Sequence, residues 1–209
     1  MGMSDLLEED IEAVAWRNAH VDDLWVFDKL ILSRKLGYCC GPAGLNVPYP
    51  GIYITRPCVN IPGMGKGASF EYIKSDTKHL PHGYFWCEVF KGRHLSIDYR
   101  NKIQVLAVEG FHTTDSLWRF EKWVKVNDFI PLPSIFAKLA DDYEYINVEY
   151  VDGKIIECHF RSNPDFIYNN TVAYPVWNDQ SQDDFKFAED MGLRYVDSPE
   201  YYRKGFFID

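Results

Sequence analysis

Acidic and basic side chains between residues 149 and 161 stand in a pattern that suits metal and phosphate chemistry. Glu157, His159 and Arg161 stand at every second position, so a β-strand would place all three on one face. Glu149 lies on the preceding segment and can face them across a hairpin. Two carboxylates suit a Mg²⁺ ion that also holds phosphate oxygens, and the planar guanidinium of Arg161 suits an anionic group. A polar, solvent-exposed strand face explains the same pattern equally well.

A second candidate is the glycine-rich stretch 61–67. Gly63, Gly65 and Gly67 allow backbone N–H groups to face a phosphate chain without a Cβ clash, and Lys66 adds a positive charge. The spacing differs from the common phosphate-loop and dinucleotide patterns. Taken alone, the stretch is more often a flexible loop between strands.

A third candidate is a pair of strands expected at 84–90 and 94–99 and joined by the turn 91–93. Their backbone N–H and C=O groups could face the edge of an adenine, with Val89 and Phe90 packed on the base. An ordinary hairpin packed in the core is the simpler explanation of this segment alone.

These candidates must be positioned by a mixture of hairpins and separate helices. Asp152-Gly153 supplies the positive φ angles of a type I′ turn and predicts a hairpin around it. Further strands are expected at 51–57 and 103–109, and helices are expected after Ser4, at 22–36 and at 134–143. The pattern predicts an α+β fold rather than a doubly wound parallel sheet.

Length and charge limit the classes of function. The chain has 209 residues, 46% of them hydrophobic, which suits one large domain or two small lobes that share a cleft. Its formal net charge of −9 argues against a nucleic-acid partner and against an anionic membrane surface. Five cysteines without a C-x-x-C pair indicate neither a zinc site nor a disulfide framework. With no long apolar run and no signal-peptide pattern, we expect a cytoplasmic protein without membrane contact.

Taken together and in order, the motifs resemble those of the ATP-grasp superfamily over residues 27–165. Phe27-Asp-Lys29-Leu resembles the start of the family's ATP-binding region, and Tyr53-Ile-Thr-Arg56-Pro resembles its strand that ends in Lys-Pro. The glycine-rich stretch falls where the family's mobile loop lies. Cys87-Glu88-Val-Phe-Lys-Gly92 resembles the segment that holds adenine, and Glu149, Glu157 and Arg161 fall on the family's Glu…Glu-x-Asn-x-Arg ending.

The resemblance implies an ATP-grasp-like fold in which two small α+β lobes with antiparallel sheets enclose a nucleotide cleft. It divides the chain into an N-terminal helical segment, 1–26, a nucleotide-binding region, 27–165, and an aromatic-rich C-terminal extension packed on it, 166–209.

The resemblance also implies cofactors and residue roles. ATP would be bound by Lys29, Arg56, Gly63, Gly65, Lys66, Gly67, Glu88, Val89 and Phe90. Mg²⁺ would be held by Glu149, Glu157 and His159, and Lys29 and Arg161 would be the catalytic residues. The implied activity is that of an ATP-dependent ligase, which activates a small carboxylate substrate as an acyl phosphate for attack by an amine or thiol.

Two alternatives to a ligase remain. One is a nucleotide-binding module without catalysis, and the other is an interaction protein. In the latter, the aromatic-rich C-terminal segment would bind another protein or a second copy of the chain.

Overall fold

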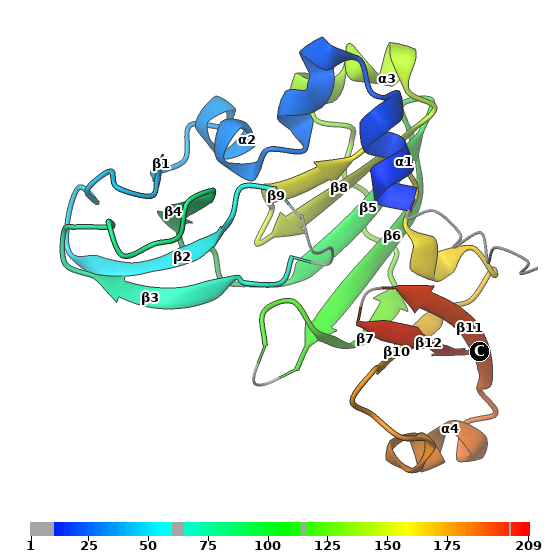
Figure 1. Ribbon diagram of the computed structural model, residues 1–209. Helices are drawn as coiled ribbons and strands as arrows, with labels where there is room; N and C mark the ends of the chain where they lie inside the picture. The colour runs from blue at the N-terminus through cyan, green and yellow to red at the C-terminus, as the bar shows by residue number, and fades with distance from the viewer. Residues whose placement is uncertain (1–10, 60–64, 114–115, 201) are drawn as a thin grey trace, which may run out of the picture.

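Strands of alternating polar and apolar residues pair into two antiparallel sheets, which form two lobes (Figure 1). The computed structural model describes residues 11–59, 65–113, 116–200 and 202–209. The smaller sheet has the order β1-β4-β2-β3. Its strands are β1 (Cys40–Pro42), β2 (Gly51–Pro57), β3 (Ser69–Ile73) and β4 (Tyr84–Glu88).

The larger sheet has eight strands in the order β11-β12-β10-β7-β6-β5-β8-β9. They are β5 (His94–Arg100), β6 (Ile103–His112), β7 (Phe120–Lys125), β8 (Tyr145–Val151), β9 (Lys154–His159), β10 (Val172–Trp177), β11 (Arg194–Glu200) and β12 (Arg203–Ile208). Every strand pair described in either sheet is antiparallel. The C-terminal strands β10–β12 therefore continue the sheet that carries the predicted metal carboxylates.

Short helices cover one end of the larger sheet (Figure 1). They are α1 (Ile11–Asn18), η1 (Val21–Val26), α2 (Lys29–Lys35), η2 (Ser134–Phe136) and α3 (Leu139–Asp142). Elsewhere the chain forms η3 (Pro164–Phe166), η4 (Gln182–Phe185) and α4 (Lys186–Asp190). Among the described residues, no helix is long and apolar enough to span a membrane.

Each of the two lobes has its own hydrophobic core. The main cluster packs the helices at the N-terminus and around α3 against β5, β6, β8 and β9, and includes the fully buried Ile97, Val148 and Phe136. A smaller cluster around Tyr53 and Trp86 supports the four-stranded sheet. Separate cores leave room for a cleft where the lobes meet.

The predicted α+β fold with two antiparallel sheets is confirmed. The hairpin around Asp152-Gly153 is confirmed as well: both residues have positive φ, 52° and 72°, between β8 and β9. The hairpin expected from 84–90 and 94–99 is wrong, because β4 belongs to the smaller sheet and β5 to the larger one. Residues 89–93 connect the lobes instead.

The N-terminal helices also differ from expectation. The helix expected at 22–36 is divided, since η1 ends at Val26 and Asp28 starts α2 by accepting a hydrogen bond from Ile31 N at 2.9 Å. The proposed cap Ser4 lies outside the described residues. At 134–143, a short 3₁₀ helix and a short α-helix replace the single expected helix. The division of the chain at residues 26 and 165 stays a prediction.

Candidate nucleotide site between the lobes

Two acidic side chains face each other on neighbouring strands at the centre of the site. Glu149 on β8 and Glu157 on β9 are cross-strand partners, as the alternation predicts. Their side chains are 21% and 13% exposed, so both charges are held largely out of water. Burial opposes ionisation of Glu157, but Lys29, His159 and Arg56 hold its pKa below the usual range. Burial also opposes ionisation of Glu149, but a hydrogen bond from His94 keeps the pKa of Glu149 low. Both carboxylates are therefore anionic at neutral pH.

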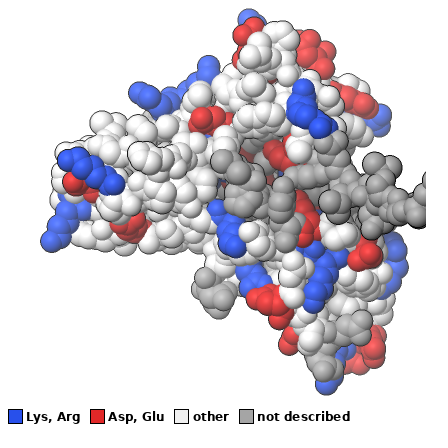
Figure 2. Space-filling model, viewed as in Figure 1, with Lys and Arg blue, Asp and Glu red and all other residues white. Residues whose placement is uncertain are grey.

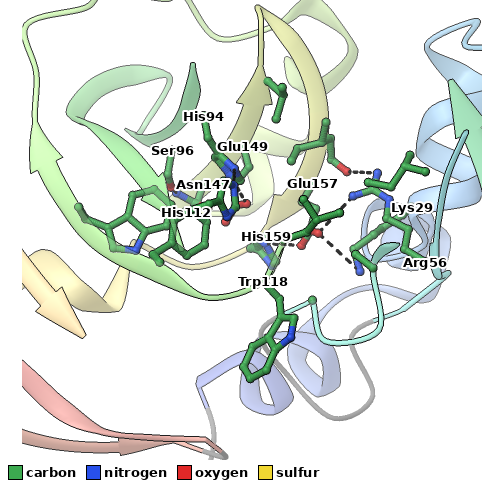
Figure 3. Close-up of a pocket in the computed structure, with 18 of the residues that line it drawn as sticks. Lys29, Arg56, His94, Ser96, His112, Trp118, Asn147, Glu149, Glu157 and His159 are labelled. Carbon is green, nitrogen blue, oxygen red and sulfur yellow. Dashed lines mark hydrogen bonds and ion pairs between the residues drawn. The ribbon is translucent and has the colours of Figure 1, made fainter. Parts of the chain in front are cut away.

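Two buried cations approach Glu157 from other elements. Lys29 Nζ lies 3.7 Å and an Arg56 terminal nitrogen 3.5 Å from Glu157 Oε1 (Figure 3). Lys29 is the first residue of α2, and its backbone N–H donates to Cys58 O at 2.8 Å, which ties α2 to the end of β2 beside Arg56. Burial lowers the pKa of Lys29, and Glu157 opposes that effect.

Arg56 joins the two lobes. It lies on β2 of the smaller sheet and donates to Ile156 O on β9 of the larger sheet at 3.1 Å. Its Nε is buried and has no hydrogen-bond partner among the described residues. A buried N–H without an acceptor is costly, so this atom points to a ligand acceptor at the lobe interface.

Two imidazoles line up behind Glu149. His94 Nε2 lies 3.1 Å from Glu149 Oε2, and His94 Nδ1 lies 3.0 Å from His112 Nε2 (Figure 3). Burial, and then His94, lower the pKa of His112 to about 4, so this ring is neutral at physiological pH. His94, Ser96 and Asp98 alternate on β5 with buried side chains, a signal that the sequence analysis did not use.

A third carboxylate, from α1, lies at the far end of β9. Glu12 Oε1 is 2.7 Å from His159 Nδ1, and Glu12 Oε2 is 2.7 Å from Arg161 Nε. Despite burial, these two cations lower the pKa of Glu12 to about 2. Sequence analysis missed Glu12 because it is 147 positions from His159, and nothing in its local pattern marks it.

The surroundings of His159 do not favour its expected metal role. Its Nε2 lies 3.6 Å from Glu157 Oε2, so both ring nitrogens face carboxylates. Burial opposes protonation, but Glu12 and Glu157 raise the pKa of His159 to about 9. A protonated imidazole has no lone pair for a metal. The described residues contain no group of three or more His, Cys, Asp or Glu side chains that could hold a metal ion.

A hydrogen-bond network fixes the loop after β9. Asp98 accepts backbone N–H of Asn163 at 2.9 and 3.0 Å and the amide of Asn147 at 2.8 Å. Asn147 also donates to Ser96 Oγ at 2.7 Å. Burial raises the pKa of Asp98, and these donors oppose the shift. The network holds the loop in place, so Arg161 has a defined position at the end of β9.

A cavity of about 370 Å³ lies where these groups meet. On the face shown in Figure 2, acidic and basic side chains lie around a hollow between the lobes. Of the residues predicted to form the site, nine line the cavity: Lys29, Arg56, Gly65, Glu88, Phe90, Glu149, Glu157, His159 and Arg161.

The remaining predicted site residues do not line it or lie outside the description. Lys66 lies over the rings of Tyr202, 3.9 Å from the centroid, and Trp118, at 5.8 Å. Gly67 packs against Tyr84, and neither Gly67 nor Val89 is among the described lining residues. Gly63 lies outside the described residues. The carboxylate of Glu88 accepts the backbone N–H of Cys39 at 2.8 Å, which fixes the end of β4.

Comparison with known proteins identifies the fold. No protein-family model matches the sequence, and no curated protein is similar to it. N5-carboxyaminoimidazole synthetase from Staphylococcus aureus, solved in complex with ADP, superposes with a TM-score of 0.53 at 12% identity over 88% of this chain. A protein from Archaeoglobus fulgidus provisionally assigned to the ATP-grasp superfamily gives 0.49 at 15% identity, also over 88%.

The chain therefore has the ATP-grasp fold, and the resemblance drawn from its motifs is confirmed at the level of the fold. It spans 67% of the Staphylococcus aureus chain and 64% of the Archaeoglobus fulgidus chain.

Proposed function

We propose that the cleft binds a magnesium-chelated nucleoside triphosphate and that the protein is ligase-like, using ATP to activate a carboxylate for attack by an amine or thiol. The observation that carries the proposal is the meeting of Glu149 and Glu157 on adjacent strands with the buried cations Lys29 and Arg56, which come from other elements. Carboxylates for a hard metal and cations for phosphate oxygens are the two requirements of such a ligand.

The residues fit this ligand in charge and in hydrogen bonding. Mg²⁺ is usually held by one or two protein carboxylates and completed by phosphate oxygens and water, so two acids suffice. Glu149 and Glu157 would hold the metal, while Lys29 and Arg56 would neutralise phosphate oxygens. The partnerless Nε of Arg56 would gain an acceptor.

The nucleobase would lie toward the connection between the lobes. Ile54, Phe90, Val151 and Ile156 give the cavity an apolar wall on that side. The segment 89–92 lies outside any strand and would present its backbone to the edge of a base, while Arg93 O already accepts from Asp152 N at 3.1 Å. The Staphylococcus aureus structure of the same fold contains ADP, which supports a nucleotide in the cleft.

Bound Mg-ATP would supply a phosphoryl group for transfer to the carboxylate substrate, which gives an acyl phosphate. Lys29 and Arg56 would stabilise the charge that develops on that group, since fixed cations in a site with little water act strongly. Arg161 would bind the substrate carboxylate in the way it now binds Glu12.

A specific observation favours a second candidate, a nucleotide-binding module without turnover. Both oxygens of Glu12 are already held at 2.7 Å by His159 and Arg161. A substrate carboxylate would have to displace an internal one, whereas nucleotide binding at Lys29 and Arg56 would be unaffected. If adding carboxylates and amines to the protein with Mg-ATP released inorganic phosphate, the ligase would be favoured over the module without turnover.

Thermal unfolding with ATP, with and without Mg²⁺, tests the nucleotide site. At about 100 times Kd, Mg-ATP should stabilise the protein by about 2.7 kcal/mol and raise Tm by a few degrees. The variant Glu157→Gln should lose the part of this shift that depends on Mg²⁺. The control Glu121→Gln removes the same single negative charge as Glu157→Gln, but at an exposed position on β7. It should keep the full Mg²⁺-dependent shift in Tm. A Mg²⁺-dependent shift of equal size in Glu157→Gln would contradict the assignment.

A further inference from the structure

Two cysteines stand opposite each other on neighbouring strands of the smaller sheet. Cys40 begins the edge strand β1, which lies beside β4 (Figure 1), and Cys87 lies near the end of β4. The two residues are register partners in this antiparallel pair, so their side chains project from the same face of the sheet. Both carry free thiols, and the proposed nucleotide site assigns no role to either.

The hydrogen-bond ladder places this pair at the closer of the two spacings in an antiparallel sheet. Glu88 N donates to Cys39 O at 2.9 Å, so Cys39 and Glu88 form a hydrogen-bonded pair, and the next pair, Cys40 and Cys87, is a non-hydrogen-bonded one. Pro42, two residues further along β1, fits this alternation because it has no N–H to donate. The Cα atoms of such a pair lie about 4.5 Å apart, inside the range of about 4.4–6.8 Å that a disulfide spans.

The other cysteines are not placed to bond with Cys87. Cys39 packs in the core cluster of the smaller lobe, on the opposite face of the chain from Cys40. Cys58 follows the end of β2, and Cys158 lies in the main core on β9. Neither is a register partner of Cys87. The geometry therefore singles out Cys40.

The two thiols differ in access to solvent, and this difference fixes the order in which they would react. Cys40 is half-buried, whereas Cys87 is 2% exposed. Burial raises the pKa of both thiols, to about 12 for Cys87, and Arg34 opposes the shift at Cys40. A reagent from solution therefore meets Cys40 first, and Cys87 reacts afterwards with the sulfur of its neighbour.

We propose that Cys40 and Cys87 are a site of reversible disulfide formation, with a small disulfide such as oxidised glutathione as the oxidant. The Cys40 thiolate attacks one glutathione sulfur, forms a mixed disulfide and releases one glutathione thiolate. The Cys87 thiolate then attacks the Cys40 sulfur, forms the cross-strand bond and releases the second glutathione. The two cysteines lose two electrons and two protons, and the oxidant gains both as it becomes two molecules of thiol.

The bond would join the edge strand to the strand that leads into the connection between the lobes. Cys87 lines the cavity, and β4 ends at the next residue. Because a disulfide that closes a long loop restricts the unfolded chain, the oxidised protein should unfold at a higher temperature. The partial exposure of Cys40 leaves the bond accessible to reductants, which makes it reversible. The inference does not depend on the proposed nucleotide function.

Oxidation of the full chain with about 5 mM oxidised glutathione at about pH 8.5, followed by alkylation and peptide mass spectrometry, tests the site. We expect a linked Cys40–Cys87 peptide, two fewer alkylated thiols than in the untreated protein, and full reversal by dithiothreitol. The Tm of the oxidised protein should exceed that of the reduced protein by at least about 5 °C.

Single serine substitutions separate this pair from the other thiols. Cys87→Ser should stop at the mixed disulfide and retain one glutathione on Cys40, whereas Cys40→Ser should leave the buried Cys87 unmodified. The matched control Cys39→Ser changes the neighbouring thiol on the other face, and should form the linked peptide and gain the Tm shift like the parent. The proposal is overturned if the parent yields no linked Cys40–Cys87 peptide, if the oxidised and reduced parent have equal Tm, or if the shift persists in Cys40→Ser.

Discussion

At the scale of single residues, the site is a chain of opposite charges along β9 and β8. Glu157 contacts Lys29, Arg56 and His159, and His159 in turn contacts Glu12. Lys29, Arg56 and His159 are buried, and the side chains of Glu157 and Glu12 are only 13% and 21% exposed, so none can lose its partner without cost. The loss of unfolding free energy expected for each mutation therefore depends on which charged partner the mutation leaves unpaired.

The pair of Glu12 and His159 should give stability a distinct pH dependence. The pKa of His159 is raised to about 9, so its contribution is complete below the ordinary imidazole pKa of about 6.5 and is lost as pH rises toward 9. The pKa of Glu12 is lowered to about 2, so its contribution is complete above about pH 4.3 and is lost as pH falls toward 2. We expect the contribution of the pair to be largest between those limits, at about pH 4.3–6.5.

Urea unfolding at pH 6 and pH 9.5 checks this prediction. The parent should lose roughly 3 kcal/mol of unfolding free energy between the two values, and Glu12→Gln should lose much less. The control Glu144→Gln breaks an exposed ion pair with Arg100 and should leave the pH dependence unchanged. Equal losses in the parent and in Glu12→Gln would show that Glu12 does not set the charge of His159.

At the scale of elements, short-range patterns were predictable and long-range pairings were not. The β8–β9 hairpin follows from Asp152-Gly153 and strict alternation, both of which are local. The alternation at 84–99 correctly indicates two strands, yet it says nothing about which sheet each strand joins. Glu12 escaped prediction for the same reason, since its partner His159 is 147 positions away.

Local patterns alone did not single out Lys29 and Arg56. The ATP-grasp resemblance did, because it took several weak motifs together in their order along the chain. Lys29 and Arg56 belong to different elements and meet at Glu157 only in the fold. The expected role of Lys66 at the phosphates is less well supported, since its side chain lies over Tyr202 and Trp118. A cation that has aromatic partners within reach can leave the position that its motif implies.

The connection between the lobes should be sensitive to a single methyl group. A Cβ at Gly92 would lie 2.8 Å from Asp152 in the β8–β9 turn, so Gly92→Ala must move the connection away from the hairpin that carries Glu149 and Glu157. We expect about tenfold weaker binding of Mg-ATP, measured by calorimetry. The control Gly83→Ala adds backbone strain at φ 80° in open space, so it should lower Tm without changing the affinity for Mg-ATP. Unchanged affinity in Gly92→Ala would show that this close approach does not position the site.

At the scale of the whole molecule, charge is distributed unevenly. The chain has a formal net charge of −9, yet the described cavity lining is balanced in charge. Its cations are Lys29, Arg56, Lys91, His159, Arg161 and Arg203, and its acids are Glu12, Glu88, Glu149, Glu157, Asp165 and Glu200. Acids pair with many of them, including Asp165 with Arg203 at 3.1 Å. The two sheets contribute opposite walls of this cavity, so a ligand bound there would contact both lobes and should stabilise their arrangement.

The most direct test of the account is diffraction from crystals grown with a non-hydrolysable ATP analogue and Mn²⁺ in place of Mg²⁺. Anomalous scattering locates Mn²⁺ independently of the rest of the map. We predict one strong peak within about 2.2 Å of carboxylate oxygens of both Glu149 and Glu157, with phosphate oxygens completing the coordination. Lys29 and Arg56 should contact the same phosphates. A nucleotide bound elsewhere, or a manganese peak that contacts neither carboxylate, would contradict the account.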